Sequence, residues 1–293
     1  MVLRIEHLSK TYGNGTRALN NVSLTIPTGM FGLLGPNGAG KSTLMRILAT
    51  LQETDAGTVM LGDIDVLADK EAVRRTLGYL PQEFGLYPKV TAEDLLDHFA
   101  VLKGITDRGE RRRIVDALFE QTNLGASRSK QLGTYSGGMR QRFGIAVALL
   151  GNPRLIIVDE PTAGLDPAER VRFLNLLSEL GENSVVILST HIVDDVSDLC
   201  SRMAIIDRGE IRLESEPLAS VNAMHGRIWT RAVDRGELAD FQRDHAVIST
   251  KLSGGRTMVR ILADGAPSPE FQPAIATLED VYFAALRQPV VSA

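Results

Sequence analysis

The stretch Gly35–Ser42, GPNGAGKS, constrains the fold more than any other part of this 293-residue chain. It fits the pattern GxxxxGK[ST], and it lies between a short apolar run at 29–35 and a stretch with helical spacing, KSTLMRILATL. Glycines let a backbone curl so that its amide N–H groups point at phosphate oxygens, and the start of a helix adds the positive end of its dipole. The pattern therefore predicts a phosphate-binding loop between a buried strand and a helix, rather than an ordinary glycine-rich turn.

Two side chains of this loop have predicted roles. Lys41 can reach the β- and γ-phosphates of a nucleotide, and the Ser42 hydroxyl can ligate Mg²⁺. Two acids, Asp159 and Glu160, follow the apolar run LIIV at 155–158 and should emerge at the carboxyl end of a buried strand, where ligands bind in open α/β sheets. We expect Asp159 to hold Mg²⁺ through water and Glu160 to orient or deprotonate an attacking water.

His191 ends the next strand pattern, at 184–190. A lone histidine in that position is usually structural, but a neighbouring strand would carry this one into the same crevice. We therefore favour a contact with the γ-phosphate.

A second turn of serine and glycines precedes a helix-like run at 135–142, YSGGMRQR. Serine and two glycines before a helix are typical of an anion-binding turn. The similar stretch LSGGR at 252–256 is followed by an alternating pattern, which indicates a β-hairpin instead.

The order of patterns predicts the organisation of the chain. Strands are expected at 2–8, 20–26, 29–35, 58–66, 77–82, 154–160, 184–190 and 202–209, with an all-helical block at about 83–150 and a helix start at Asp166-Pro167. Alternating strands and helices favour a mostly parallel sheet covered on both faces. Residues 215–293 read as a small α/β accessory domain with strands at 227–233, 246–252 and 257–263 and a final helix at 277–287.

Composition excludes several classes of function. The net charge of −4 gives no basic field for nucleic acid, and the single cysteine, Cys200, allows no cysteine metal cluster and is expected in the core. The N-terminus lacks the apolar core of a signal peptide, and no apolar run is long enough to span a bilayer. The arginine-rich segment 108–113 could contact anionic lipid, but a solvated helix face is the favoured reading. We expect a cytoplasmic protein.

Taken together, these motifs resemble the nucleotide-binding subunit of ATP-binding cassette (ABC) transporters. The resemblance covers residues 2 to about 215, in the order that the family has. Tyr12 matches the aromatic that stacks on adenine, residues 35–43 match the Walker A loop, and Gln82 matches the glutamine that touches Mg²⁺ and senses the membrane partner. Residues 135–139 match the signature, Asp159 and Glu160 the Walker B acids, Gly164-Leu165-Asp166 the loop that crosses the dimer, and His191 the switch histidine.

The resemblance implies a fold and a set of site residues. The expected fold is α/β: a P-loop core with an antiparallel β subdomain and a helical subdomain in residues 1–214, followed by the accessory domain. The implied ATP contacts are Tyr12, Gly35, Pro36, Asn37, Gly38, Ala39, Gly40, Lys41, Ser42 and Thr43, with Ser136, Gly137, Gly138 and Asp166. Ser42, Gln82 and Asp159 would hold Mg²⁺, and Glu160, His191, Lys41 and Gln82 would act in hydrolysis.

In this family two cassettes face each other head to tail, so Ser136–Gly138 would cap ATP held by a second cassette. The partners implied are a homologous or identical cassette and a transmembrane permease on a separate chain, at the cytoplasmic face of the membrane. The YSGGM signature departs from the usual LSGGQ, and AGLD stands where SALD is common. This signature and the ending LEDVYFAAL are similar to the ABC-2 type exporter group.

Three alternatives stay open from the sequence. One is an ABC ATPase acting in translation or DNA maintenance, although those usually carry two cassettes or long coiled-coil arms. A second is a module that binds ATP without hydrolysing it, against which Glu160 and His191 argue. The third concerns Phe84, Leu86 and Tyr87, which could present an apolar contact to a membrane partner or belong to the subdomain core.

Overall fold

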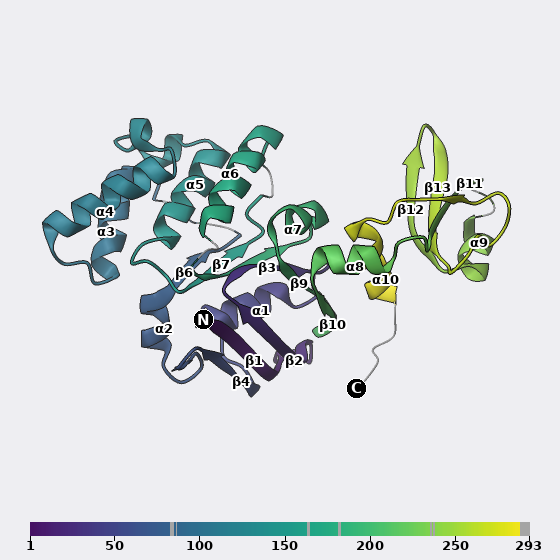
Figure 1. Cartoon of the computed structure of the whole chain (residues 1–293). Coiled ribbons are helices and arrows are strands. Elements are labelled where there is room, and N and C mark those ends of the chain that lie inside the picture. The colour runs from purple at the N-terminus through teal and green to yellow at the C-terminus, as the bar shows by residue number, and fades with distance from the viewer. Residues whose placement is uncertain are drawn as a thin grey trace.

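The computed structural model of the chain describes residues 1–82, 85, 87–162, 165–180, 183–234, 236 and 238–287. Figure 1 shows two sheets and several helices packed together, with a third sheet, β11–β13, standing apart beyond α8 and α10. The predicted α/β class is confirmed.

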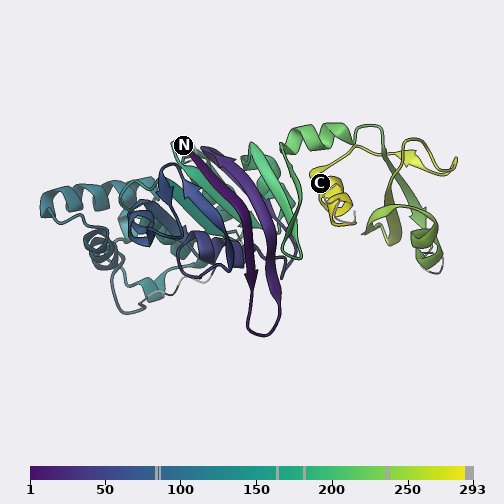
Figure 2. The ribbon, with the colours of Figure 1, turned by 90° about the horizontal axis from the view of Figure 1, so that it is seen from below.

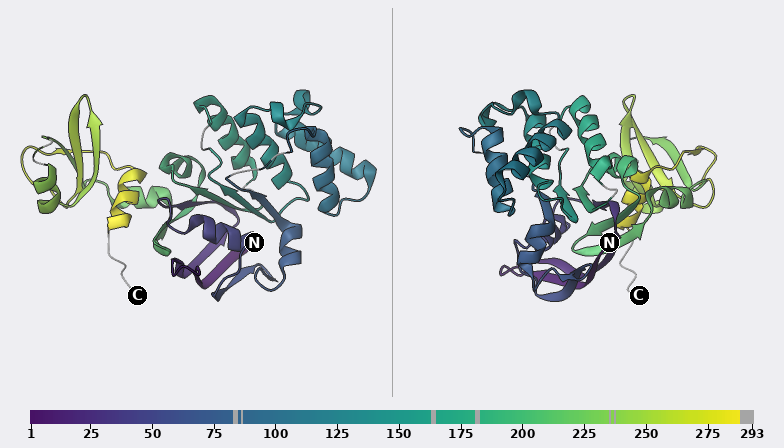
Figure 3. Two further views of the ribbon diagram at one scale, coloured as in Figure 1. Left: turned by 180° about the vertical axis from the view of Figure 1, so that it is seen from behind. Right: turned by 60° about the vertical axis from the view of Figure 1, so that its left-hand side comes forward.

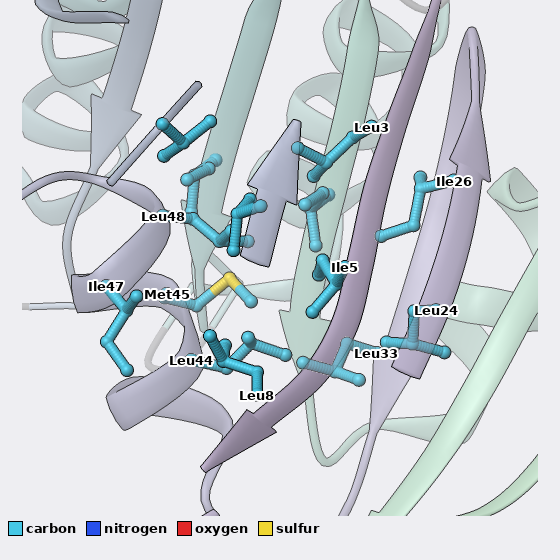
Figure 4. Packing of buried hydrophobic residues seen from close by; sticks show 14 of the residues in the cluster. Leu3, Ile5, Leu8, Leu24, Ile26, Leu33, Leu44, Met45, Ile47 and Leu48 are labelled. Carbon is cyan, nitrogen blue, oxygen red and sulfur yellow. The ribbon is translucent and has the colours of Figure 1, made fainter. Parts of the chain in front are cut away.

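The first sheet is antiparallel and is formed mostly by the N-terminal part of the chain. Its order is β2-β1-β4-β5, from β1 (Val2–Thr11), β2 (Arg17–Pro27), β4 (Ala56–Leu61) and β5 (Ile64–Asp65). Leu3 and Ile5 of β1 alternate with exposed residues and pack with Leu24 and Ile26 of β2, as Figure 4 shows. The strands expected at 2–8 and 20–26 are confirmed and extend further.

The second sheet is the six-stranded centre of the protein. Its order is β10-β9-β3-β8-β7-β6, from β3 (Gly29–Leu34), β6 (Leu77–Leu80), β7 (Leu155–Asp159), β8 (Val185–Thr190), β9 (Arg202–Asp207) and β10 (Glu210–Ser215). All neighbours pair in parallel except β10 with β9. The parallel strands read as continuous apolar runs because both faces of the sheet are covered.

Successive residues of β7 pack into two different cores. Leu155 and Ile157 join the core formed with the antiparallel sheet and α1 (Lys41–Leu48), which lie on one face. Ile156 and Val158 join the core on the other face, formed with α5 (Gly137–Ala148), α6 (Pro167–Leu180) and α7 (Val193–Leu199). The short helix α2 (Lys70–Thr76), which the sequence analysis does not anticipate, contributes Val73 to the first core.

The described residues between β6 and β7 are mainly helical, as expected, and contain no strand. The helices are α3 (Ala92–Leu102), α4 (Arg108–Gln121), the 3₁₀ turns Gly125–Ser127 and Leu132–Thr134, and α5. Thr91 and Asp107 cap α3 and α4 by accepting hydrogen bonds from backbone N–H groups. Most of 108–113 is exposed, as expected for a solvated helix face, and Arg111 forms an ion pair with Asp97 at 2.6 Å. Within the described residues, no helix is both long and apolar enough to cross a membrane.

The third sheet lies in the C-terminal part and has the order β12-β13-β11-β14. Its strands are β11 (Ile228–Val233), β12 (Val247–Ser253), β13 (Arg256–Leu262) and β14 (Gln272–Pro273), and α9 (Leu238–Asp244) packs beside them. Figure 2 and the left view of Figure 3 show this sheet to one side of the rest of the molecule. The three strands and the final helix expected here are confirmed.

Two helices join the third sheet to the other two sheets and their helices. Leu278, Val281 and Tyr282 of α10 (Leu278–Arg287) share a core with α6, α7 and Cys200, and α8 (Pro217–Ala223) packs against α10. Cys200 is buried, as expected, and burial raises the pKa of its thiol to about 12. The domain boundary near residue 215 stays a prediction.

Candidate functional site

The loop between β3 and α1 has the curled shape that its glycines predict. Gly38 and Gly40 have φ values of 80° and 110°, which favour glycine. The loop is pinned by a hydrogen bond from Gly209 N–H to the Ala39 carbonyl, 2.8 Å. A Cβ at Gly40 would lie 2.4 Å from the Ala18 carbonyl oxygen, so glycine is required for fit as well as for conformation. β2 and the β9–β10 turn therefore hold the loop in place.

Lys41 is the first residue of α1, and its side chain is 5% exposed. Its ammonium donates hydrogen bonds to the carbonyl oxygens of Gly35, 2.7 Å, and Pro36, 3.2 Å. Burial lowers the pKa of Lys41, and the charge of Glu160, 3.7 Å away, opposes this. The ammonium thus lies inside the loop, where a phosphate group would meet both it and the N-terminus of α1.

A cavity of about 470 Å³ opens in front of this loop. Four segments line it, contributing Tyr12, Thr16, Arg17, Ala18, Pro36, Asn37, Gly38, Ala39, Gly40, Lys41, Ser42, Thr43, Gln82 and Glu160. A larger hollow of about 610 Å³ lies between α7, α8, β12 and α10, but it contains no phosphate loop. The smaller cavity is therefore the candidate site, since it collects the predicted residues of the loop with Tyr12, Gln82 and Glu160.

Tyr12 stands at the edge of this cavity, just after β1. Its side chain is 38% exposed, and its hydroxyl lies 3.1 Å from the Thr43 hydroxyl and within hydrogen-bonding distance of Gln52. The hydrogen bond with Thr43 is the main cause that lowers the Tyr12 pKa. These bonds hold the ring beside the phosphate loop with part of its surface free, as a ring that stacks on a base requires.

Asp159 ends β7 behind the cavity and is 4% exposed. Burial raises the pKa of its carboxyl group. Its Oδ1 is buried without a hydrogen-bond partner, as is the hydroxyl of Ser189, its register neighbour on β8. An unpaired buried carboxylate oxygen is costly unless a ligand or water satisfies it.

The unpaired Oδ1 of Asp159 suits a site for a hard divalent cation. The donor set that the sequence predicts, with Ser42 and Gln82, consists of oxygens, which Mg²⁺ prefers. No group of three or more His, Cys, Asp and Glu side chains suited to a metal occurs among the described residues. The protein would thus supply only part of the coordination shell of Mg²⁺, as is usual where phosphate oxygens provide the remaining ligands.

Glu160 is the point where the predicted catalytic groups meet. Its Oε2 lies 3.1 Å from His191 Nδ1 and accepts a hydrogen bond from Gln82 Nε2 at 3.4 Å, while its Oε1 faces Lys41. Its φ of 48° is a left-handed conformation that costs a residue with a side chain free energy and is often found at functional sites. The structure brings Glu160, His191, Gln82 and Lys41 together, and β7 and β8 are neighbours as expected.

The second turn, Ser136–Gly138, lies elsewhere. None of its three residues is among the described residues that line the cavity. Ser136 caps α5, accepting a hydrogen bond from Met139 N–H at 3.2 Å, and both Ser136 and Gly137 are exposed. A Cβ at Gly137 would meet nothing within 4 Å. The chain therefore presents this turn outward, away from its own phosphate loop.

Asp166 also lies outside the cavity. It is exposed and caps α6, accepting a hydrogen bond from Glu169 N–H at 2.9 Å, which confirms the predicted helix start. Gly164 of the same motif lies outside the described residues, as do Phe84 and Leu86 of the apolar segment beside Gln82. Tyr87 of that segment is 63% exposed, which favours a contact surface over subdomain core for this residue.

The sequence analysis missed three groups near the site. Arg17 and Thr16 line the cavity opposite the phosphate loop, and the signal available was the position of Arg17 at the end of the glycine-rich turn after Tyr12. Ser189 lies beside Asp159, and only the register between β7 and β8 reveals this. Thr162 and Asp195 form a buried contact behind Glu160, for which the sequence gives no signal.

A P-loop fold whose phosphate loop opens onto a cavity with a carboxylate beside it is typical of a nucleoside triphosphatase. Comparisons agree, because residues 19–163 match the family described as ABC transporter. Linearmycin resistance ATP-binding protein LnrL of Bacillus subtilis is 36% identical, covering 72% of this chain and 68% of LnrL. An uncharacterized ABC transporter ATP-binding protein of the same species, YxlF, is 32% identical over 96% of this chain and 98% of its own length. The chain belongs to the ATP-binding proteins of ABC transporters, and it is an ATPase.

Other comparisons extend this result. Daunorubicin/doxorubicin resistance ATP-binding protein DrrA of Streptomyces peucetius is 38% identical, covering 71% of this chain and 63% of DrrA. Among solved structures, a dimeric post-hydrolysis state of the ATP-binding cassette MJ0796 bound to ADP and Pi superposes with a TM-score of 0.67 at 29% identity. That match covers 73% of this chain and 98% of the cassette.

Proposed function

We propose that this chain is the motor subunit of an ABC-2 type exporter, in which two cassettes bind ATP between them and drive a transmembrane subunit on a separate chain. The observation that carries the proposal is the incompleteness of the site in one chain. The cavity has a phosphate loop and the carboxylate of Glu160, while the other anion-binding turn, Ser136–Gly138, does not line it and exposes Ser136 and Gly137. A second copy or a homologue would supply the missing turn.

Within one chain, the residues have distinct tasks toward ATP. Tyr12 stacks on the base, the amides of 35–43 bind the phosphates, and Lys41 exchanges its loop carbonyls for phosphate oxygens. Ser42, Asp159 and Gln82 would hold Mg²⁺, which would neutralise part of the phosphate charge when bound. The unpaired Oδ1 of Asp159 supports this assignment.

Hydrolysis would use Glu160 and His191. Glu160 orients an attacking water and accepts its proton, while His191, 3.1 Å away, holds the carboxylate and senses the γ-phosphate. Gln82 contacts the same carboxylate and begins the segment that leads to exposed Tyr87. Loss of the γ-phosphate would thus be felt at a surface suited to a membrane partner.

The turn Ser136–Gly138 would cap the γ-phosphate held by the partner cassette. Its free amides and the N-terminus of α5 suit an anion, and Asp166 would lie beside the same interface. Met139 stands where the family usually has glutamine, but the backbone and Ser136 carry the anion-binding geometry. The dimeric structure of the related MJ0796 cassette supports two-cassette assembly.

The exporter assignment draws on relatives. LnrL and DrrA are named as resistance proteins, which fits removal of a compound from the cell. The alternative, a cassette ATPase in translation or DNA maintenance, has no support among these relatives. A membrane partner would place this chain at the cytoplasmic face of the cell membrane.

The proposal can be tested by isolating the tagged full chain from detergent-solubilised membranes and identifying what accompanies it. A polytopic membrane protein in stoichiometric amount is the expected result, and its identity would narrow the substrate. Ribosomes or DNA-repair proteins without a membrane protein would overturn the exporter assignment.

A further inference from the structure

Asp195 is a fully buried carboxylate that takes no part in the cavity. It lies in the first turn of α7 and is 0% exposed. The Thr162 hydroxyl donates a hydrogen bond to its Oδ2 at 2.6 Å, and Arg170 donates to its Oδ1 from Nε at 2.8 Å and contacts it with a second nitrogen at 2.7 Å. Three separate segments therefore meet at one carboxylate: the chain after β7, the helix after β8, and α6.

Stability alone is a weak explanation for such a group. Removing two charges from water costs free energy that offsets much of their mutual attraction. Apolar residues of similar volume often stabilise a core better than a buried ion pair does. α7 already packs tightly without it, since Val196 lies so close to β3 that a Cβ on Gly32 would approach it to 2.5 Å. The contact is better explained by what it joins.

The partners of Asp195 lie directly beside the hydrolytic pair. Thr162 follows Glu160 by two residues, and Asp195 follows His191 by four. The Glu160–His191 contact of 3.1 Å and the Thr162–Asp195 hydrogen bond of 2.6 Å thus connect the same two segments at two successive points. Because the Thr162–Asp195 hydrogen bond holds the two segments together, it limits how far Glu160 and His191 can separate.

Glu160 needs such restraint because its backbone is strained. A left-handed residue with a side chain persists only where its surroundings hold it. On its N-terminal side, Glu160 N–H donates to the Ser189 carbonyl at 2.8 Å. On its C-terminal side, beyond Pro161, Thr162 provides the next side-chain anchor.

We infer that Asp195 is a positioning residue for ATP hydrolysis, which acts through Thr162 to hold Glu160 against His191. Arg170 orients the carboxylate and links it to α6, whose N-terminal cap is Asp166. Movement of the Asp166 segment at a cassette interface would therefore reach the hydrolytic pair through Asp195. The inference rests on the role proposed for Glu160.

The test compares two substitutions of Thr162 in the full chain. Thr162→Val keeps the shape but removes the donor, and Asp195 stays paired with Arg170. We expect kcat for ATP to fall about tenfold, while KM and the affinity for ATP stay within about twofold, because small misplacements near reacting groups reduce rate more than binding. Thr162→Ser keeps the hydroxyl and should restore most of kcat.

A double substitution separates positioning from stability. In a Glu160→Gln background there is no catalytic carboxylate left to position, so adding Thr162→Val should not lower the residual rate further. An unchanged kcat in Thr162→Val alone, or an equal loss in Thr162→Ser, would overturn the inference. Asp195→Asn, which keeps an acceptor for Thr162 but weakens the link to Arg170, should give a smaller loss of kcat than Thr162→Val.

The same variants distinguish a failure of the role proposed for Glu160 from a failure of the positioning role of Asp195. If Glu160→Gln itself hydrolyses ATP at the normal rate, the proposed role of Glu160 fails. If Glu160→Gln is inactive and Thr162→Val is fully active, only the positioning role of Asp195 fails.

Discussion

The phosphate loop and the turn Ser136–Gly138 begin alike, as glycine-rich turns ahead of a helix, yet the structure treats them in opposite ways. The loop is enclosed by β2 and the β9–β10 turn and opens onto a cavity that also contains Glu160. In the second turn Ser136 caps α5 and Gly137 faces open space, while the buried Gly138 packs against Glu169 of α6. A local anion-binding motif therefore does not define a site by itself, because the surrounding elements determine which anion it can bind.

The largest effect should come from removing the Glu160 carboxylate, which is the proposed catalytic group of the enclosed side. Glu160→Gln keeps the contact geometry with Gln82 and His191 but cannot accept a proton, so kcat should fall by about 100-fold or more. ATP should then remain bound and hold two chains together. Steady-state turnover and size-exclusion chromatography with ATP measure both results. Hydrolysis at the wild-type rate would show that Glu160 is not the catalytic group.

The outward turn can be tested without disturbing the fold. A side chain at Gly137 meets nothing within 4 Å, so Gly137→Asp should fold normally and place a negative charge where a partner's phosphate would lie. We expect turnover to drop by at least about tenfold through charge repulsion, with ATP binding to the single chain unchanged. Gly137→Ala, which adds volume without charge, is the matched control.

Mixing two impaired variants tests whether the loop of one chain works with the turn of the other. Lys41→Ala damages the loop, and Gly137→Asp damages the turn. A mixed dimer would contain two different sites. One site would combine the damaged loop of the Lys41→Ala chain with the damaged turn of the Gly137→Asp chain. The other site would combine the intact loop of the Gly137→Asp chain with the intact turn of the Lys41→Ala chain. An equal mixture should therefore recover about a quarter of wild-type turnover if the dimer has two-fold symmetry and its sites act independently. No recovery, with mixed dimers demonstrated, would mean that the turn does not serve the partner's site.

Substitution of Tyr12 should give a smaller effect, because the role proposed for Tyr12 is in binding ATP rather than in hydrolysis. Tyr12→Ala removes the ring, and KM for ATP should rise about five- to tenfold with little change in kcat, in line with the energy of base–aromatic stacking. Tyr12→Phe keeps the ring and loses only the hydrogen bonds with Thr43 and Gln52, so its KM should stay near normal. Equal losses in both variants would indicate that the hydroxyl matters rather than the stacking.

The sequence predicts one of these two regions far better than the other. The phosphate loop, its strand and its helix follow from residues 29–48 alone, because each local preference agrees with the fold. The meeting of Glu160 and His191 follows from the order of strands in a parallel sheet, whereas Gln82 is expected at the site only from the resemblance to the family. Asp195 could not be predicted, since its partners Thr162 and Arg170 come from elements whose approach depends on packing. The same limit explains why α2 and β10 were missed: their short patterns carry little periodic signal.

A third glycine turn, Ser253-Gly254-Gly255, completes the comparison and should show the smallest effect. It connects β12 to β13, and φ values of 56° and 79° at its two glycines match a two-residue hairpin, which confirms the interpretation of LSGGR. Since no helix follows it, it lacks the dipole that the other two turns offer an anion. Ser253→Ala should leave ATP turnover unchanged. Gly255→Ala forces a side chain into a left-handed conformation and should cost about 1 kcal/mol of stability, measurable by denaturant unfolding, again without slowing hydrolysis. A loss of turnover in Ser253→Ala at normal stability would give this turn a role toward ATP and break the distinction between motif and surroundings.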